Sequence, residues 1–266
     1  MRIVRFVAGG EVHFGRQVDD HHALLIEGEL FGPHRITDRG VKMEKLLAPL
    51  IPTDILCIGL NYREHAKEGG SAIPINPVLF IKASNSLNNP YDPIPIPRRS
   101  GQIDYECELA VIIGKTAKYV TRENALEYVF GYTCANDVSA RDWQRDKGLG
   151  GGQFARGKSF DGFCPLGPCI LTRDEIADPN ALRLKTTLNG QIMQNHTTAD
   201  MIFDVPTLIE SLSSTMTLRP GAVILTGTPS GVGFARTPPV WMKHGDTVVV
   251  EVEKIGRLEN PVRAEA

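Results

Sequence analysis

Short apolar runs separated by turn-forming residues dominate the pattern of this chain. Residues 55–60 are apolar apart from one glycine and lie between Pro52 and Asn61, which predicts a buried strand. Residues 106–113 alternate charged and apolar positions at first and then continue as an unbroken apolar run. That continuation predicts a strand buried on both faces. Strands are therefore expected to make up most of the fold.

A few segments carry helix or turn signals instead. The segments 121–132 and 204–216 each begin with a residue type that caps helices, Thr and Asp respectively, so a short helix is expected in each. The dipeptide Asn189-Gly190 predicts the type I′ turn of a hairpin. Residues 42–50 are expected to form one or two helical turns.

This order of elements predicts a mostly β fold with short helices, of the α+β class, without regular alternation of strand and helix. Residues 1–51 show short strands joined by Gly and Asp turns, which predicts a small N-terminal β-rich domain. Residues 52–266 are expected to form the larger, catalytic domain.

Composition narrows the classes of partner. The chain has 266 residues, is 42% hydrophobic and carries a net charge of −2 with both signs mixed along its length. Since it has no basic tract, we expect neither nucleic acid nor a membrane as partner, but a small molecule. No apolar run approaches the ~18–20 residues of a membrane span, and the N-terminus is too polar for a signal peptide. The five cysteines are scattered without a CxxC motif, which predicts reduced thiols and a cytoplasmic location.

Three carboxylates form the first candidate site. Glu106 and Glu108 are two residues apart on the predicted strand and point to one face, where like charges repel and burial is costly. Together with Asp137 they offer the hard oxygen ligands that suit Mg²⁺ or Mn²⁺, with Ca²⁺ as a further option, and not Zn²⁺. The alternative is a solvated strand face.

His65 and Glu68 form the second candidate site. At positions i and i+3 they share one face if this segment is helical. A histidine oriented by a carboxylate can act as a general base. The alternative is an ordinary surface pair.

Three further features can recognise an anion. Lys158 supplies a cation, and the glycines of residues 226–233 allow backbone N–H groups to approach an anion, although a plain turn explains them equally. Arg141 and Gln144 can bind a carboxylate, unless they only form a solvated helix face.

Eight segments in order across residues 52–263 resemble the fumarylacetoacetate hydrolase family, especially its acylpyruvase and oxaloacetate-acting branches. The segments are LCIGLNYREHAKE, PVLFIKAS, DYECELAVIIGK, GYTCANDVSARDWQ, GKSFDGFCPLGP, LNGQIMQ, TLRPGAVILTGTPSGVG and GDTVVVEVEKIGRLENPV. One departure is Ala222, where the family often has Asp; it lies in a turn and bears on local stability rather than on chemistry.

The resemblance implies a mixed β-roll, usually in homodimers, and assigns roles to matching residues. The implied metal ligands are Glu106, Glu108 and Asp137. The implied catalytic residues are His65, Glu68 and Lys158. The implied substrate-binding residues are Arg141, Gln144 and Thr228.

The implied function is hydrolysis of a C–C bond in a 2,4-dioxo acid through a metal-stabilised enolate. The same site can instead serve an oxaloacetate decarboxylase, an oxaloacetate tautomerase or a hydroxymuconate-type isomerase. A metal-binding homologue without activity is a further alternative. The glycines at 148 and 150–152 predict a mobile lid over the site.

Overall fold

The computed structural model describes residues 1–149 and 152–265, and strands dominate it. The largest sheet has twelve strands and runs in the order β4-β3-β2-β1-β14-β12-β11-β17-β6-β7. β5 and β8 pair with it beside β1 and β14. The mostly β fold with short helices that the sequence predicts is confirmed.

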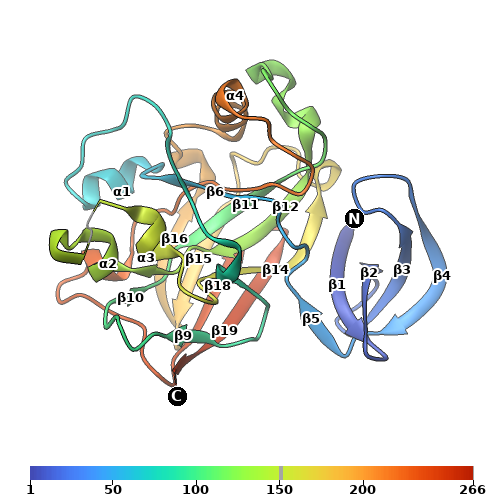
Figure 1. Cartoon of the computed structure of the whole chain (residues 1–266), viewed down its shortest axis with the longest axis horizontal. Helices are drawn as coiled ribbons and strands as arrows, with labels where there is room; N and C mark the ends of the chain where they lie inside the picture. Colours follow the sequence, from blue (N-terminus) through green and yellow to red (C-terminus); the bar gives the residue numbers. More distant parts are fainter. Residues whose placement is uncertain (150–151, 266) are drawn as a thin grey trace.

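The N-terminal part of this sheet consists of β1 (Arg2–Ala8), β2 (Glu11–Gln17), β3 (His22–Gly28), β4 (His34–Lys42) and β5 (Lys45–Leu47). Figure 1 shows these strands to one side of the molecule, where β1 pairs with β14 through Arg2 and Leu171. The twelve-stranded sheet thus runs through both predicted domains, and the boundary at residue 51 stays a prediction.

One expectation in this region is wrong. Residues 42–50 do not form helical turns, because Lys45–Leu47 is extended and pairs with β1, with Leu46 opposite Phe6. A long-range sheet pairing that buries Leu47 outweighs a weak local helix preference.

The rest of the chain completes the large sheet and adds two smaller ones. The large sheet continues with β14 (Cys164–Thr172), β12 (Val129–Asn136), β11 (Cys107–Ile113), β17 (Val223–Leu225), β6 (Ile55–Gly59), β7 (Val78–Ile81) and β8 (Leu87–Asn88). A five-stranded sheet contains β16 (Gln191–Thr197), β15 (Arg183–Leu188), β18 (Thr247–Val252), β19 (Gly256–Ala264) and β9 (Ile94–Ile96). A two-stranded sheet pairs β10 (Ile103–Asp104) with β13 (Ser139–Ala140).

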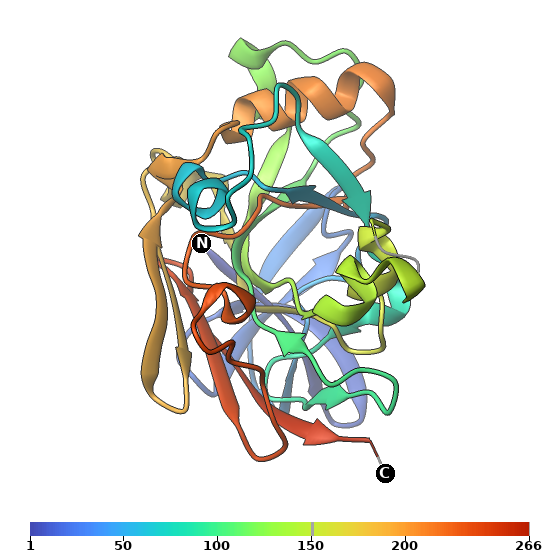
Figure 2. The same ribbon diagram turned by 90° about the vertical axis from the view of Figure 1, so that its left-hand side faces the viewer.

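The helices are short. They are α1 (Arg63–Glu68), α2 (Arg141–Arg145), α3 (Phe154–Lys158) and α4 (Val205–Thr215). Turns of 3₁₀ helix are η1 (Ser84–Ser86), η2 (Arg122–Tyr128), η3 (Lys147–Leu149), η4 (Arg173–Glu175), η5 (Thr198–Asp200) and η6 (Gly233–Ala235). Figure 2 shows α4 lying across one end of the molecule.

The local signals had mixed outcomes. The helix predicted at 204–216 is α4, and its cap is confirmed, since Asp204 accepts a hydrogen bond from Thr207 N at 2.9 Å. The hairpin turn is confirmed by positive φ angles at Asn189 and Gly190. The helix predicted at 121–132 is wrong in part: Arg122–Tyr128 is a 3₁₀ segment, residues 129–132 belong to β12, and the Thr121 side chain forms no cap hydrogen bond.

The largest core cluster lies between the two main sheets. Leu109 and Val111 of β11 belong to it together with Leu184 of β15, Val250 of β18 and Leu208 of α4. Because these side chains occupy one face of β11, the other face and the end of the strand remain for a second core and for polar groups. All five cysteines are buried and free.

Candidate active site

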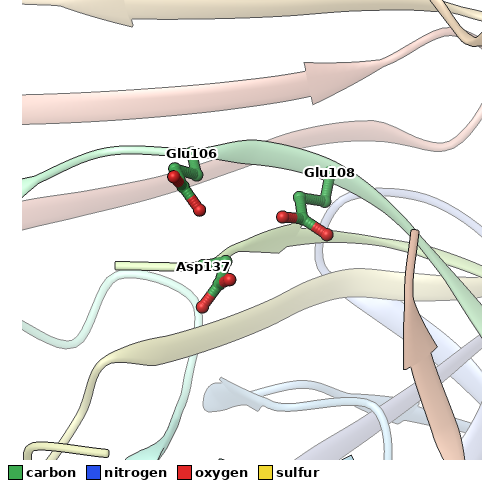
Figure 3. A group of neighbouring side chains, drawn as sticks. All are labelled: Glu106, Glu108 and Asp137. Carbon is green, nitrogen blue, oxygen red and sulfur yellow. The ribbon is translucent and has the colours of Figure 1, made fainter. Parts of the chain in front are cut away.

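The carboxylate cluster follows from the register of two strands. β11 and β12 are antiparallel, with Cys107 opposite Asn136, so Glu106 and Asp137 meet just beyond the paired residues. Asp137 N donates to Glu106 O at 2.9 Å. One ligand oxygen from each of Glu106, Glu108 and Asp137 lies within 4.8 Å of the others, and Figure 3 shows the three carboxyl groups around one space.

Cations compensate one of the two glutamates. Glu106 is 4% exposed, and its two oxygens accept from Arg141 at 2.6 Å and from Lys158 at 2.5 Å. Burial alone would raise the pKa of Glu106, but Arg141 and Lys158 outweigh burial and lower that pKa to about 2. Glu106 therefore stays ionised over the physiological range.

The other glutamate is in a different environment. Glu108 is 2% exposed, and Gly227 N donates to its Oε2 at 2.6 Å. Burial, followed by repulsion from Asp137 and Glu106, raises the pKa of Glu108 well above its ordinary value. Of the three carboxyl groups, Glu108 is therefore the one whose ionised form a further cation would stabilise most.

Two lysines hold Asp137. Lys158 Nζ lies 2.5 Å from one carboxylate oxygen, and Lys82 Nζ lies 2.6 Å from the other. Burial disfavours the charged ammonium, but Asp137 and Glu106 outweigh it and raise the pKa of Lys158. Sequence reasoning missed Lys82, although its position directly after an apolar strand was a usable signal.

Arg141 is held by side chains of the protein. Its Nε donates to Asp104 at 2.8 Å, and one terminal nitrogen donates to Gln144 Oε1 at 2.8 Å while the other reaches Glu106. Asp104 is fully buried and was also missed. It lies two residues before Glu106, so the alternation that indicated Glu106 and Glu108 extends to it.

The His65–Glu68 pair forms on α1, where the two residues share a helix face as predicted. His65 Nδ1 lies 3.0 Å from Glu68 Oε2, and Gly231 N donates to Glu68 Oε1 at 2.8 Å. A carboxylate only accepts hydrogen bonds, so Nδ1 carries a proton, and in the neutral imidazole the lone pair is then on Nε2. His65 is 9% exposed and packs edge-on against Phe234.

Thr228 is fixed by the backbone of β11. Its hydroxyl donates to Cys107 O at 3.0 Å and accepts from Gln194 Nε2 at 2.8 Å. Gln194 also accepts from Cys107 N and Thr186, so a fully satisfied network supports this wall. Gln194 was not identified from sequence, because nothing distinguishes it from a surface strand residue.

A cavity of about 200 Å³ brings these groups together. The predicted residues that line it are His65, Glu106, Glu108, Arg141, Gln144, Lys158 and Thr228. Phe80, Phe154 and Phe234 supply apolar walls. Glu68 and Asp137 act on this cavity through His65 and Lys158, which they contact.

The donor set fits a divalent metal ion. Three carboxylates are the oxygen ligands of hard cations, and each oxygen that already accepts from an ammonium or guanidinium group keeps a second lone pair. Glu108 is the carboxylate of the three whose charge the protein compensates least, so a bound cation would stabilise its ionised form most.

The predicted lid was assigned in part to residues 150 and 151, which lie outside the described residues. Within the described part, Gly152 has a positive φ of 89° and its N–H donates to Gln144 O at 3.0 Å. This ties the end of the segment to α2. The lid itself stays a prediction.

A mostly β fold that gathers three buried carboxylates and a His–Glu pair around one small cavity defines an enzyme with a carboxylate-lined active site. The family model described as Fumarylacetoacetate (FAA) hydrolase C-terminal matches residues 54–263, and one described as Rv2993c-like, N-terminal matches residues 1–49. The chain belongs to the fumarylacetoacetate hydrolase family, as its motifs indicated.

Individual relatives carry different activities in their names. The chain is 48% identical over 218 residues to oxaloacetate tautomerase fahd2, mitochondrial, of Xenopus laevis, covering 82% of this chain and 68% of that protein. It is 38% identical to the structure of 5-carboxymethyl-2-hydroxymuconate delta-isomerase from Mycobacterium smegmatis, with a TM-score of 0.87 and 100% of both chains covered. It is 40% identical to fumarylacetoacetate hydrolase from Exiguobacterium antarcticum, with a TM-score of 0.88 and the same coverage.

Location and assembly stay predictions. No helix among the described residues is long and apolar enough to cross a membrane. The cytoplasmic location was expected from the cysteines and the homodimer from the resemblance, and the Xenopus relative is named mitochondrial.

Proposed function

We propose that this protein is an isomerase that interconverts the keto and enol forms of oxaloacetate. The observation that carries the proposal is that buried His65, held by Glu68, lines the cavity that Glu106, Glu108 and Lys158 also line. A positioned base beside a cationic and carboxylate-rich wall is the machinery that proton transfer next to a carbonyl requires. The names of the Xenopus tautomerase and the Mycobacterium isomerase support this choice over the hydrolysis first expected from sequence.

The proton path begins at His65. Glu68 holds the Nδ1–H, so Nε2 takes the proton from C3 of the substrate. The electron pair of the C–H bond forms the C2–C3 double bond, and the π pair of the C2 carbonyl moves to its oxygen. His65 then returns the same proton to that oxygen. The reaction is an isomerisation in which no atom is gained or lost.

The second requirement is a place for the negative charge that develops on the oxygen. Lys158 supplies a buried ammonium group, oriented by Glu106 and Asp137 at 2.5 Å each. Glu106, Glu108 and Asp137 would hold a divalent cation, which would supply Lewis-acid stabilisation of the same charge.

Of the three predicted substrate-binding residues, Gln144 and Thr228 keep that role as part of the proposal. Gln144 and Thr228 line the cavity, where Arg141 donates to Gln144 Oε1 and Gln194 donates to the Thr228 hydroxyl. Fixed polar groups orient a small substrate without losing further side-chain entropy on binding. Arg141 acts mainly by holding Glu106 and Gln144 in place.

Hydrolysis of a 2,4-dioxo acid is the second candidate. The observation that favours it is the same His65–Glu68 pair, which can activate a water molecule for attack on a carbonyl. The name of the Exiguobacterium structure agrees with it. The decarboxylation of oxaloacetate remains a variant of the same chemistry.

One experiment separates these candidates. Oxaloacetate and acetylpyruvate are followed by NMR in parallel with Mg²⁺ and with an EDTA control. We expect accelerated keto–enol exchange of oxaloacetate without cleavage. Acetate and pyruvate from acetylpyruvate would instead establish the hydrolase, and metal-dependent pyruvate from oxaloacetate would establish the decarboxylase.

A further inference from the structure

Arg145 places a positive charge on the wall of the cavity that no carboxylate of the described protein neutralises. Four residues that can carry positive charge line the cavity: His65, Arg141, Arg145 and Lys158. Arg141 and Lys158 are engaged by carboxylates. The Arg145 guanidinium stacks on the Phe234 ring, with Cζ 4.5 Å from its centroid. It forms no ion pair with any residue of the ranges 1–149 and 152–265.

Phe234 connects Arg145 to the reacting groups. The guanidinium carbon of Arg141 lies 4.6 Å from the same ring centroid, and the ring of His65 meets it edge-on at 6.2 Å. Arg141 in turn donates to Glu106 at 2.6 Å. The Phe234 ring therefore contacts both Arg145 and Arg141, and Arg141 is bonded to the carboxylate cluster through Glu106.

This arrangement is fixed by the backbone. Phe234 N donates to Asp104 Oδ2 at 3.1 Å, and Gly233 N donates to Asp104 Oδ1 at 2.8 Å. Asp104 also accepts from Arg141, so the ring and the first residue of α2 share one buried anchor. Arg145 is four residues after Arg141 and occupies the same helix face, which directs both toward Phe234.

We propose that Arg145 binds the carboxylate of the substrate that is remote from its 2-oxo acid group, and so selects dicarboxylates over monocarboxylates. This inference rests on the proposed function. A guanidinium that stacks on a ring keeps its N–H edge available for two parallel hydrogen bonds to a carboxylate. Arg141 is already held by Asp104, Glu106 and Gln144, which take three of its five N–H donors.

The test compares two substrates in the unchanged protein and in three variants, one of which is a control. Oxaloacetate carries the remote carboxylate, and acetylpyruvate carries a methyl ketone instead. Keto–enol interconversion of each is measured with Mg²⁺ for the unchanged protein, Arg145→Met and Arg145→Lys. The matched control is Arg156→Met, since Arg156 stacks on Trp143 at 4.9 Å but does not line the cavity.

For Arg145→Met, we expect kcat/KM for oxaloacetate to fall about 10- to 100-fold, as for a lost hydrogen-bonded charge pair, with acetylpyruvate within about 3-fold. Arg145→Lys should recover part of the loss, and Arg156→Met should match the unchanged protein. An equal loss for both substrates, or no loss for oxaloacetate, would overturn the role of Arg145.

Binding measurements distinguish a failure of the proposed function from a failure of the inference about Arg145. If the unchanged protein turns over neither substrate, calorimetric Kd values for oxaloacetate and pyruvate still test the inference. A preference for oxaloacetate that Arg145→Met removes would support it without any catalysis. Equal binding of the two acids by the unchanged protein would overturn it.

Discussion

The carboxylate cluster and the His65–Glu68 pair face the same cavity but are held by different means. The cluster is a set of buried opposite charges contributed by segments far apart in the chain, with Lys158 joining Glu106 and Asp137. The pair lies within one helical turn, and one backbone N–H completes it. Changes in the cluster are therefore expected to alter both the stability of the fold and catalysis, whereas changes in the pair are expected to alter mainly catalysis.

The largest effect on stability is expected from Lys158→Met. It leaves two buried carboxylates without a shared cation, and breaking a buried pair from one side costs about 3–5 kcal/mol. The matched control is Lys185→Met, which breaks the half-exposed pair with Glu251 and should cost at most about 1 kcal/mol. Urea unfolding of both variants checks this. Similar losses in the two would break the proposed contrast.

Magnesium should stabilise the folded protein through the cluster. Ligand present at 100 times its Kd adds about 2.7 kcal/mol, which should disappear with EDTA and in Glu108→Gln. Without metal, Glu108→Gln should be neutral or stabilising, because a raised folded-state pKa means that stability falls as pH rises above the unfolded value of 4.5. Thermal unfolding with and without Mg²⁺ measures both, and an unchanged response to Mg²⁺ in Glu108→Gln would remove this residue from the ligand set.

The helix cap at Asp204, which lies outside the site, gives a reference for the free energies of unfolding predicted above. Asp204→Ala should cost about 1 kcal/mol at pH 7, the usual value for an N-cap. Although burial opposes it, hydrogen bonds from Thr207 and the charge of Arg122 lower the pKa of Asp204 below 3.8. Its contribution is therefore present above pH 3.8 and is lost as pH falls through the folded pKa. The melting temperatures of the unchanged protein and of Asp204→Ala should therefore converge in acid. A difference between the two melting temperatures that does not change with pH would contradict this.

The smallest effect on stability is expected from Glu68→Gln. The new side chain can still accept from Gly231 N, so unfolding should shift by less than about 0.5 kcal/mol. Turnover should nevertheless fall by about 10²–10⁴, the usual contribution of acid–base catalysis, because the imidazole loses its anionic partner. Parallel unfolding and rate measurements test this, and a large loss of stability would place the pair with the cluster.

Local sequence signals predicted much of the site. Alternation along residues 106–108 and the spacing of His65 and Glu68 indicated side chains that the structure brings together: Glu106, Glu108 and His65 line one cavity, and Glu68 contacts His65. The partners that compensate the charges were harder to see. Lys82 and Asp104 stand beside local signals, but their partners Asp137 and Arg141 are far away in the sequence and are set by the long-range fold.

The fold shows the same division between local and long-range information. The α4 cap and the Asn189-Gly190 turn depend on neighbouring residues, and both were predicted. The strand at Lys45–Leu47 depends on β1, so a local helix preference was misleading there. The choice between isomerase and hydrolase rests on whether water joins the reaction, which no residue type encodes.

The most direct test follows oxaloacetate by NMR with Mg²⁺, using the unchanged protein and His65→Ala. The account predicts accelerated keto–enol exchange without cleavage in the first, and loss of that exchange in the variant at nearly unchanged Mg²⁺ affinity. Exchange at the full rate in His65→Ala, or cleavage in place of exchange, would contradict the account.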